Sequence, residues 1–315
     1  MRRRTVLGLG ALALGGGWTW AGYRSDMAAV RAGRTDPSGT IPTRFGQVEW
    51  AEAGSGAPLL ILHGTGGGYD QGLLFARRLS RGGWRVIAPS RFGYLGSDCP
   101  ENPTPADQAD ALAELLDHLG IARLPVLGGS AGAISAIEFA IRHPARCAAL
   151  VPIVPAAYAP NRPPMRPDPG GAAVMRFGLR SDFLFWAGIG LAEDRMIATL
   201  LATDPALVHA APPDERARVR AILRGILPVS ARARGLLVDA AQAGNPSPQA
   251  LDRVRAPTLA ISLEDDRFLT ADAARHIAAY VAGARLLIYP TGGHVWVGHD
   301  AELFGAVAAF LRGLA

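Results

Sequence analysis

A serine stands among glycines at residues 128–132, in the order Gly-Gly-Ser-Ala-Gly. This pattern matches G-x-S-x-G, and it lies between an apolar run at 124–127 and an alanine-rich segment. A strand that turns sharply into a helix here has no room for flanking side chains, and it lifts Ser130 above a sheet. We call this segment the elbow. Its serine is a candidate nucleophile, and the alternative is an ordinary serine in a glycine-rich turn.

A serine hydroxyl needs a base to accept its proton near neutral pH. Of the seven histidines in the chain, we favour His294, because it follows two glycines after an apolar run at 285–289. A loop in that place can hold the imidazole over the elbow. His299 is the alternative, although it precedes the final helical segment and is better suited to begin that helix.

An acid must then orient the imidazole and stabilise the imidazolium that forms during the reaction. Glu264, Asp265 and Asp266 follow the apolar run at 258–263, one strand before the strand that leads to His294. We predict Asp266 in this role, with Asp265 and Glu264 as alternatives. The chain order of the three groups is serine, aspartate, histidine.

A second glycine-rich segment, His-Gly-Thr-Gly-Gly-Gly at 63–68, follows another apolar run. Backbone N–H groups in such a loop can approach the negative oxygen that develops when a carbonyl is attacked. We predict an oxyanion hole made by the amides of Ala131 and Thr65, with Gly66 as a neighbour. The competing interpretation, a phosphate-binding loop, lacks a P-loop lysine and the spacing of a dinucleotide fingerprint. We expect His63 to order the loop.

The elements that position these residues alternate along the chain. Apolar runs typical of buried parallel strands fall at 58–62, 84–89, 124–127, 148–154, 258–263 and 285–289. Amphipathic or alanine-rich stretches typical of helices fall at 105–119, 133–141, 271–281 and 301–311. The segment 45–53 favours an early strand or hairpin arm. This alternation predicts an α/β fold with a mainly parallel sheet flanked by helices.

A long insertion interrupts the alternation. A proline-rich stretch and helix-like pieces near 181–189 and 213–226 occupy this part of the chain, so we predict a helical cap. The predicted divisions are an export signal or membrane anchor at 1–23, a linker at 24–43, a sheet domain at 44–155 and 253–315, and the cap at 156–252.

Aromatic and aliphatic side chains crowd one stretch of the predicted cap, 175–191. If the cap covers Ser130, at least one of Phe183, Phe185 and Trp186 lines an apolar substrate pocket. The alternative is that this stretch only attaches the cap to the sheet domain.

Composition excludes several classes of protein. Of the 315 residues, 49% are hydrophobic and 19% charged, which excludes a disordered or fibrous chain. The net charge is +5, the chain has no lysine, and no basic patch indicates nucleic-acid binding. The two cysteines, Cys99 and Cys147, are too few for a disulfide framework, and no spacing indicates a metal site. We expect neither a metal nor an organic cofactor, and the sequence leaves the oligomeric state open.

The first 23 residues resemble a targeting segment. Arg2, Arg3 and Arg4 precede an apolar run that ends near Ala21, as in secretory leaders, and the paired arginines resemble a twin-arginine signal. We expect cleavage or a retained membrane anchor, and either outcome places the rest of the chain outside the cytoplasm, in the periplasm or at the membrane. The alternative is an incidental leader on a cytoplasmic protein.

Taken in order, the four motifs resemble the α/β-hydrolase superfamily over about residues 45–314. The resemblance implies a hydrolase that forms an acyl-enzyme on Ser130 and acts on a small hydrophobic ester or related carbonyl compound. It also implies that no cofactor takes part.

Arg267 and Phe268, directly after the acid, are similar to a subgroup of the superfamily, the carbon–carbon bond hydrolases of aromatic-ring degradation. In that subgroup Trp-Ala-Gln typically follows the histidine and the oxyanion loop carries Gly-Pro, whereas this chain has Val295 and Trp296 and no proline in the loop. A carbon–carbon bond hydrolase and a cofactor-free haloperoxidase-like enzyme are the enzymatic alternatives. A non-catalytic receptor of the same fold that binds a small apolar ligand is the alternative of another class.

Overall fold

The centre of the fold is a single sheet. A computed structural model describes residues 19–165, 178 and 180–314. The strands are β1 (Gly39–Thr43), β2 (Gly46–Ala53), β3 (Ala57–Leu62), β4 (Trp84–Pro89), β5 (Leu124–Gly129), β6 (Cys147–Ile153), β7 (Leu259–Leu263) and β8 (Arg285–Tyr289). Their spatial order is β1-β2-β4-β3-β5-β6-β7-β8. β2 pairs antiparallel with β1 and β4, and the other pairings are parallel.

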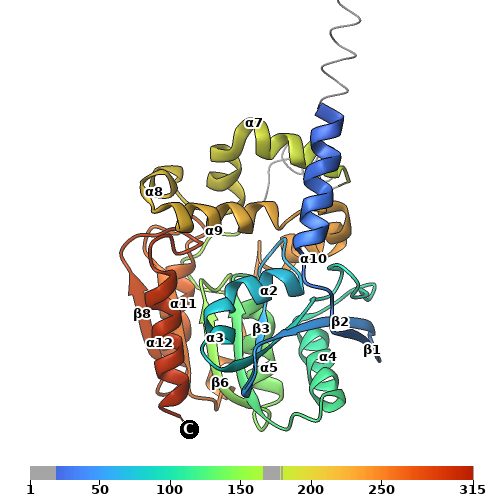
Figure 1. Ribbon diagram of the computed structural model, residues 1–315. Coiled ribbons are helices and arrows are strands. Elements are labelled where there is room, and N and C mark those ends of the chain that lie inside the picture. Colours follow the sequence, from blue (N-terminus) through green and yellow to red (C-terminus); the bar gives the residue numbers. More distant parts are fainter. Residues whose placement is uncertain (1–18, 166–177, 179, 315) are drawn as a thin grey trace, which may run out of the picture.

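Helices cover both faces of this sheet (Figure 1). One face carries α4 (Pro105–His118), α5 (Gly132–Arg142) and α11 (Thr270–Tyr280). The other face carries α2 (Tyr69–Phe75), α3 (Arg77–Arg81) and α12 (Asp300–Arg312). The predicted α/β fold, with a mainly parallel sheet between helices, is confirmed.

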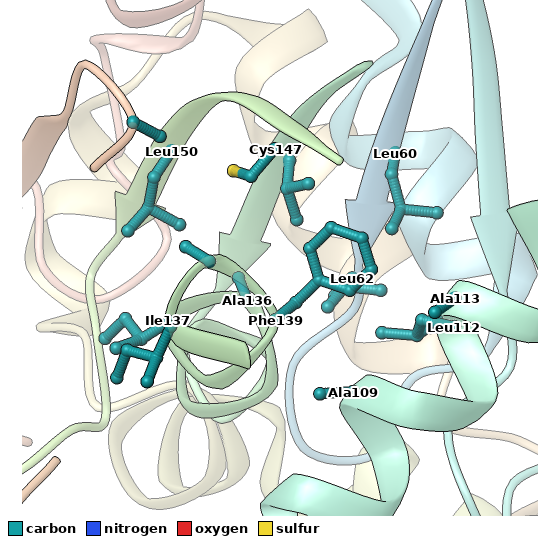
Figure 2. Close-up of a cluster of buried hydrophobic side chains, with 14 of the residues drawn as sticks. Leu60, Leu62, Ala109, Leu112, Ala113, Ala136, Ile137, Phe139, Cys147 and Leu150 are labelled. Atoms are coloured by element: carbon teal, nitrogen blue, oxygen red, sulfur yellow. The ribbon is translucent and has the colours of Figure 1, made fainter. Parts of the chain in front are cut away.

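The strand β3 shows why the central strands are apolar throughout. Leu60 and Leu62 belong to the core on the α4 and α5 side, whereas Leu59 and Ile61 belong to the core on the opposite side. Successive side chains of a strand point to opposite faces, so where both faces are covered successive residues are buried, as Leu59–Leu62 are here. Figure 2 shows the first of these cores, in which Phe139 of α5 lies near β3.

Four helices stand between β6 and β7. They are α7 (Asp182–Leu200), α8 (Pro205–Ala210), α9 (Pro213–Arg224) and α10 (Ala233–Gln242), and no strand occurs in the described part of this insertion. In Figure 1, α7, α8 and α9 lie together on one side of the sheet domain. We refer to the described residues between β6 and β7, which include these three helices and α10, as the cap.

The segment that we predicted as a linker, 24–43, has regular structure. Residues 19–33 are helical, and β1 follows and pairs with β2. This N-terminal helix packs on the cap: Met27 is 3% exposed in a cluster that includes Ile189 of α7, and Tyr23 and Val30 pack against the same cluster. Its apolar residues recur at helical spacing, a signal that the arginines between them obscured.

The predicted export signal falls mainly on residues 1–18, which lie outside the described residues. Within the described ranges, no helix combines the length and the apolar character needed to cross a bilayer. Export and membrane attachment therefore stay predictions.

Candidate active site

Ser130 lies at the turn between β5 and α5, in a strained backbone. Its φ is +53°, in the left-handed region that residues with side chains rarely adopt. A Cβ at Gly128 would lie 2.6 Å from the Gly132 carbonyl oxygen, and a Cβ at Gly132 would lie 2.4 Å from the Leu62 carbonyl oxygen. Backbone crowding thus requires glycine on both sides of the serine.

His294 lies beside the serine, with its Nε2 2.9 Å from the Oγ of Ser130. The loop that follows β8 reaches this place through Gly292 and Gly293, which have φ values of +130° and +61°. A Cβ at Gly293 would lie 2.5 Å from the hydroxyl oxygen of Thr203, just after α7. The imidazole reaches the elbow through a turn that favours glycine at both positions.

Asp266 lies on the other side of the imidazole and is buried. Its Oδ2 is 2.8 Å from the Nδ1 of His294 and also accepts a hydrogen bond from the Thr270 hydroxyl. Its Oδ1 accepts from the Phe268 amide at 2.8 Å. With Nδ1–H donated to this carboxylate, the Nε2 of His294 is left to accept the proton of the serine hydroxyl.

The other two acids of the segment have different partners. Asp265 accepts hydrogen bonds from the amides of Gly292 and Gly293 at 3.0 and 2.8 Å, so it holds the loop that carries the histidine. Glu264 is half-exposed and pairs with Arg275 of α11. Of the three acids predicted as candidates, only Asp266 contacts the imidazole.

His299, the alternative base, stands at the start of α12. Its Nδ1 is 3.3 Å from Glu302, its ring stacks on Tyr289 with centroids 4.4 Å apart, and its carbonyl accepts from the Leu303 amide. It is the N-cap residue of the final helix.

The loop 63–68 lies against the elbow, because a Cβ at Gly64 would be 3.1 Å from the Cβ of Ser130. The Gly66 amide donates to the hydroxyl of Tyr94 at 3.2 Å. In contrast, the amides of Thr65 and Ala131 donate no hydrogen bond to any of the described residues. The two amides predicted as oxyanion donors are therefore unengaged, whereas the amide of the neighbouring Gly66 is already bonded.

His63 is fully buried at the start of this loop. Its Nδ1 donates to the Gly64 carbonyl at 2.8 Å, and its Nε2 accepts from the Arg91 amide at 2.9 Å. Burial, together with the charge of Arg91, lowers the pKa of His63 well below its ordinary value. The neutral ring therefore orders the loop.

Among the described residues, no three His, Cys, Asp or Glu side chains come together in a group that could hold a metal ion. The site is built from a hydroxyl, an imidazole, a carboxylate and backbone amides.

Sequence comparison agrees with the observed fold. The family model described as alpha/beta hydrolase fold matches residues 57–297, which is most of the chain. The chain belongs to the α/β-hydrolase family. The predicted resemblance to the α/β-hydrolase superfamily is thereby confirmed, and the protein is an α/β-fold hydrolase.

Relatives of this hydrolase extend over most of its length. The 2-hydroxy-6-oxononadienedioate/2-hydroxy-6-oxononatrienedioate hydrolase of Paraburkholderia xenovorans is 28% identical and covers 89% of this chain and 96% of its own. The 2-hydroxy-6-oxo-6-phenylhexa-2,4-dienoate hydrolase of Comamonas testosteroni is 27% identical over 84% of this chain and 91% of its own. An α/β-hydrolase fold protein from Nakamurella multipartita has a solved structure with 29% identity and a TM-score of 0.70, covering 88% and 99% of the two chains.

The aromatic residues that we predicted for the pocket of this hydrolase have other contacts. The Phe183 ring lies 5.8 Å from that of Trp20 and 5.4 Å from that of Tyr23. The Trp186 ring lies 5.6 Å from that of Tyr23, and its indole N–H donates to Asp26 at 2.8 Å. Phe185, in turn, packs against the apolar cluster of the cap.

These contacts give the aromatic residues of α7 a structural role, and the substrate pocket stays a prediction. Phe183 and Trp186 attach the cap to the N-terminal helix, at residues 19–33, and their partners are not at the elbow. We predicted a linker where that helix lies, so the apolar stretch was assigned either to a substrate pocket or to attachment of the cap to the sheet domain. Ile226, which we did not predict, packs against the oxyanion loop instead: a Cβ at Gly66 would lie 3.3 Å from its side chain.

Three further residues near the site were missed. Arg91 and Tyr94 follow β4, and both contact Asp239 of α10. Arg91 and Tyr94 stand after a buried parallel strand, where polar residues of α/β folds meet, so that position was a usable signal. Asp239 lies within an amphipathic cap helix, and no local pattern sets it apart.

Proposed function

We propose that this α/β-fold hydrolase attacks esters or related carbonyl compounds with Ser130 and forms an acyl-enzyme. The observation that carries the proposal is the pair of contacts on His294, 2.9 Å to the serine hydroxyl and 2.8 Å to Asp266. A serine hydroxyl aligned with an imidazole, which is itself aligned with a buried carboxylate, is the arrangement that nucleophilic acyl transfer requires.

In the first half of the reaction, Ser130 Oγ attacks the carbonyl carbon while its proton passes to the Nε2 of His294. Asp266 accepts the Nδ1–H bond and stabilises the imidazolium. The negative oxygen of the tetrahedral intermediate accepts hydrogen bonds from the free amides of Thr65 and Ala131. Collapse expels the alcohol, which takes the proton from His294, and leaves an ester on Ser130.

In the second half, His294 accepts a proton from water, whose oxygen attacks the acyl carbon. The resulting intermediate releases the carboxylic acid, and Ser130 recovers its proton from the imidazolium. Each proton that leaves the imidazole was accepted by it in the same half-reaction, so the cycle needs no cofactor.

Apolar groups border the reacting atoms and favour a small hydrophobic substrate. The Phe268 ring stands edge-on to the imidazole of His294, with centroids 4.8 Å apart. Ile226 of the cap packs on the oxyanion loop. Burial of each substrate methylene against such surfaces contributes about 0.8 kcal/mol.

Labelling with a fluorophosphonate probe tests this function, because the probe phosphonylates only an activated serine. We expect stoichiometric labelling of the wild type, together with turnover of aryl acetates and butyrates. Ser130→Ala should abolish both the labelling and the turnover while the circular dichroism spectrum stays unchanged. Equal labelling of the two proteins would contradict the proposal.

A carbon–carbon bond hydrolase is the second candidate. It is favoured by the Paraburkholderia xenovorans relative, which covers 89% of this chain at 28% identity and whose name describes a hydrolase of 2-hydroxy-6-oxononadienedioate. Comparing kcat/KM for that compound with kcat/KM for an aryl ester decides between the two. A preference of more than about 100-fold for the dienedioate, equivalent to about 2.7 kcal/mol, would assign the protein to the second class.

A further inference from the structure

The hydroxyl of Tyr94 connects the oxyanion loop to the cap. It accepts a hydrogen bond from the Gly66 amide at 3.2 Å and donates one to the Oδ2 of Asp239 at 2.5 Å. Tyr94 belongs to the sheet domain and is fully buried, whereas Asp239 lies in α10 of the cap. Burial and the nearby carboxylate raise the pKa of Tyr94 well above its ordinary value, so the hydroxyl keeps its proton.

Arg91 makes a second connection from the same carboxylate. Its Nη1 and Nη2 donate to the two oxygens of Asp239 at 2.8 and 2.6 Å, and these side chains are 5% and 2% exposed. The Nε of Arg91 donates to the His63 carbonyl at 3.0 Å, and its backbone amide donates to the His63 ring at 2.9 Å. The buried ion pair therefore reaches the first residue of the oxyanion loop.

The two connections reach the loop on opposite sides of the Thr65 amide: Arg91 contacts His63 before it, and Tyr94 contacts Gly66 after it. The peptide that carries this amide has the Gly64 carbonyl at its other end, which is held by the His63 ring at 2.8 Å and by the Gly67 amide at 3.2 Å. The next amide along the chain is the one bonded to Tyr94. Because peptide units are planar, holding the carbonyl and the following amide restricts the direction of the Thr65 N–H.

The helix α10 is seated directly on Tyr94. A Cβ at Gly235 would lie 2.3 Å from the Tyr94 ring, and the Gly235 amide donates to the Gly93 carbonyl at 2.9 Å. The Leu95 amide donates at 2.9 Å to the carbonyl of Ala231, in the turn that leads directly into α10. Movement of α10 away from the sheet domain would break these bonds together with the contacts of Asp239.

We propose that Tyr94 and Asp239 are positioning residues, through which docking of α10 orients the Thr65 amide toward the oxyanion. The inference rests on the acyl-enzyme function proposed above. It gives the cap a part in the chemical step, because an amide that is misdirected stabilises the transition state less while substrate binding is unaffected.

A purely structural role must be distinguished from this one. Removing one partner of a buried ion pair destabilises a protein whatever else the pair does, so loss of stability alone decides nothing. Tyr94→Phe is the informative variant, because it keeps the ring beneath α10 and removes only the hydroxyl that joins Gly66 to Asp239.

For Tyr94→Phe we expect kcat with an aryl acetate to fall about 10- to 100-fold, with KM within about twofold. The rate of fluorophosphonate labelling should fall by a similar factor. Tyr69→Phe is the matched control: Tyr69 is also buried, and its hydroxyl donates to the Thr35 carbonyl at 2.9 Å rather than to the oxyanion loop. Its kcat should stay within about twofold of the wild type.

A thionoester gives a readout that a structural role would not change, because its sulfur accepts hydrogen bonds poorly. The wild type should prefer an ester to the matching thionoester, and Tyr94→Phe should reduce that preference by about tenfold. Asp239→Asn should change the preference in the same direction. If Asp239→Asn does not fold, the Tyr94→Phe result decides alone.

Wild-type kcat and an unchanged ester preference in Tyr94→Phe would overturn this inference. The proposed function would still stand in that case, provided that wild-type labelling depends on Ser130. Absence of Ser130-dependent labelling in the wild type would instead contradict the proposed function and, with it, the role of Tyr94.

Discussion

The elbow around Ser130 and the aromatic stretch of α7 are both conspicuous in composition, but different forces position them. At the elbow, carbonyl oxygens of the turn and of β3 lie within 2.6 Å of where a Cβ would stand on either flanking glycine. In α7, Phe183 and Trp186 are positioned by the rings of Trp20 and Tyr23 in a distant part of the chain.

The difference explains why one region was easier to interpret than the other. Backbone crowding leaves no room for a side chain on either glycine that flanks the serine, and the resulting pattern of glycines is visible within five residues of the sequence. The elbow can therefore serve only a narrow set of purposes. Burial of aromatic surface is non-directional, and any apolar partner satisfies it. An apolar stretch therefore indicates that something covers it without indicating what.

The largest effect is expected where the elbow meets its base. His294→Ala should lower kcat for an aryl ester by about 10⁴-fold or more, because the serine loses its proton acceptor. His299→Ala, which changes only the start of α12, should cost about tenfold or less. Steady-state kinetics on both variants check the ranking, and the reverse order would move the base to His299.

A somewhat smaller effect is expected at the acid. Asp266→Asn should lower kcat by about 10³- to 10⁴-fold, because an amide no longer stabilises the imidazolium. Asp265→Asn should weaken the hydrogen bonds to Gly292 and Gly293 and cost about tenfold, mainly through a less ordered loop. Similar kcat values for the two variants would show that Asp266 has no special role.

One glycine-to-alanine variant in the elbow and one in α7 compare the steric constraints on the two regions through the free energy of unfolding. Gly132→Ala at the elbow should lower the free energy of unfolding by about 2–4 kcal/mol, because the Cβ meets two backbone carbonyls. Gly190→Ala in α7 should raise it by about 0.5–1 kcal/mol, because no atom lies within 4 Å of the new Cβ. Urea unfolding of both variants measures the difference. A tolerated Gly132→Ala would mean that the elbow is less constrained than its contacts indicate.

Trp186→Ala should lower the free energy of unfolding by about 2 kcal/mol, since a half-buried ring and a hydrogen bond to Asp26 are lost. The ratio of kcat/KM for butyrate and acetate esters should stay within about twofold. Ile226→Ala is the matched comparison, because Ile226 touches the oxyanion loop, and it should change that ratio several-fold. A change in acyl preference with Trp186→Ala alone would instead support the predicted substrate-pocket role of Trp186.

The smallest effect concerns pH and His63. In the folded protein the pKa of His63 lies well below 6.5, whereas the unfolded chain takes up a proton near that pH. The stability that the folded protein gains by keeping His63 neutral is therefore fully present above about pH 6.5. It decreases as the pH falls, by at most about 1.4 kcal/mol per pH unit. Unfolding free energies of the wild type and of His63→Gln between pH 7 and 5.5 measure the contribution. If the unfolding free energy changes equally with pH in both proteins, His63 is excluded as the source of this pH dependence.

Much of the sheet domain was predictable from the sequence because its signals are local. Both faces of β3 are covered, so every residue of the strand is apolar, and a glycine-flanked serine after a buried strand indicates an elbow. The order of serine, aspartate and histidine also followed from the positions of the strands that carry them. These patterns depend on backbone sterics and on the two-residue period of a strand, which neighbouring residues display.

Tertiary structure alone decided the partners of the cap. The Gly66 amide is bonded to Tyr94, Asp239 reaches the loop at residues 63–68 from another part of the chain, and Phe183 packs on the N-terminal helix at residues 19–33. In each case the deciding contact joins segments distant in sequence. Such contacts are selected by the shape and charge of surfaces that exist only after the elements have packed, so no local pattern in the sequence contains them.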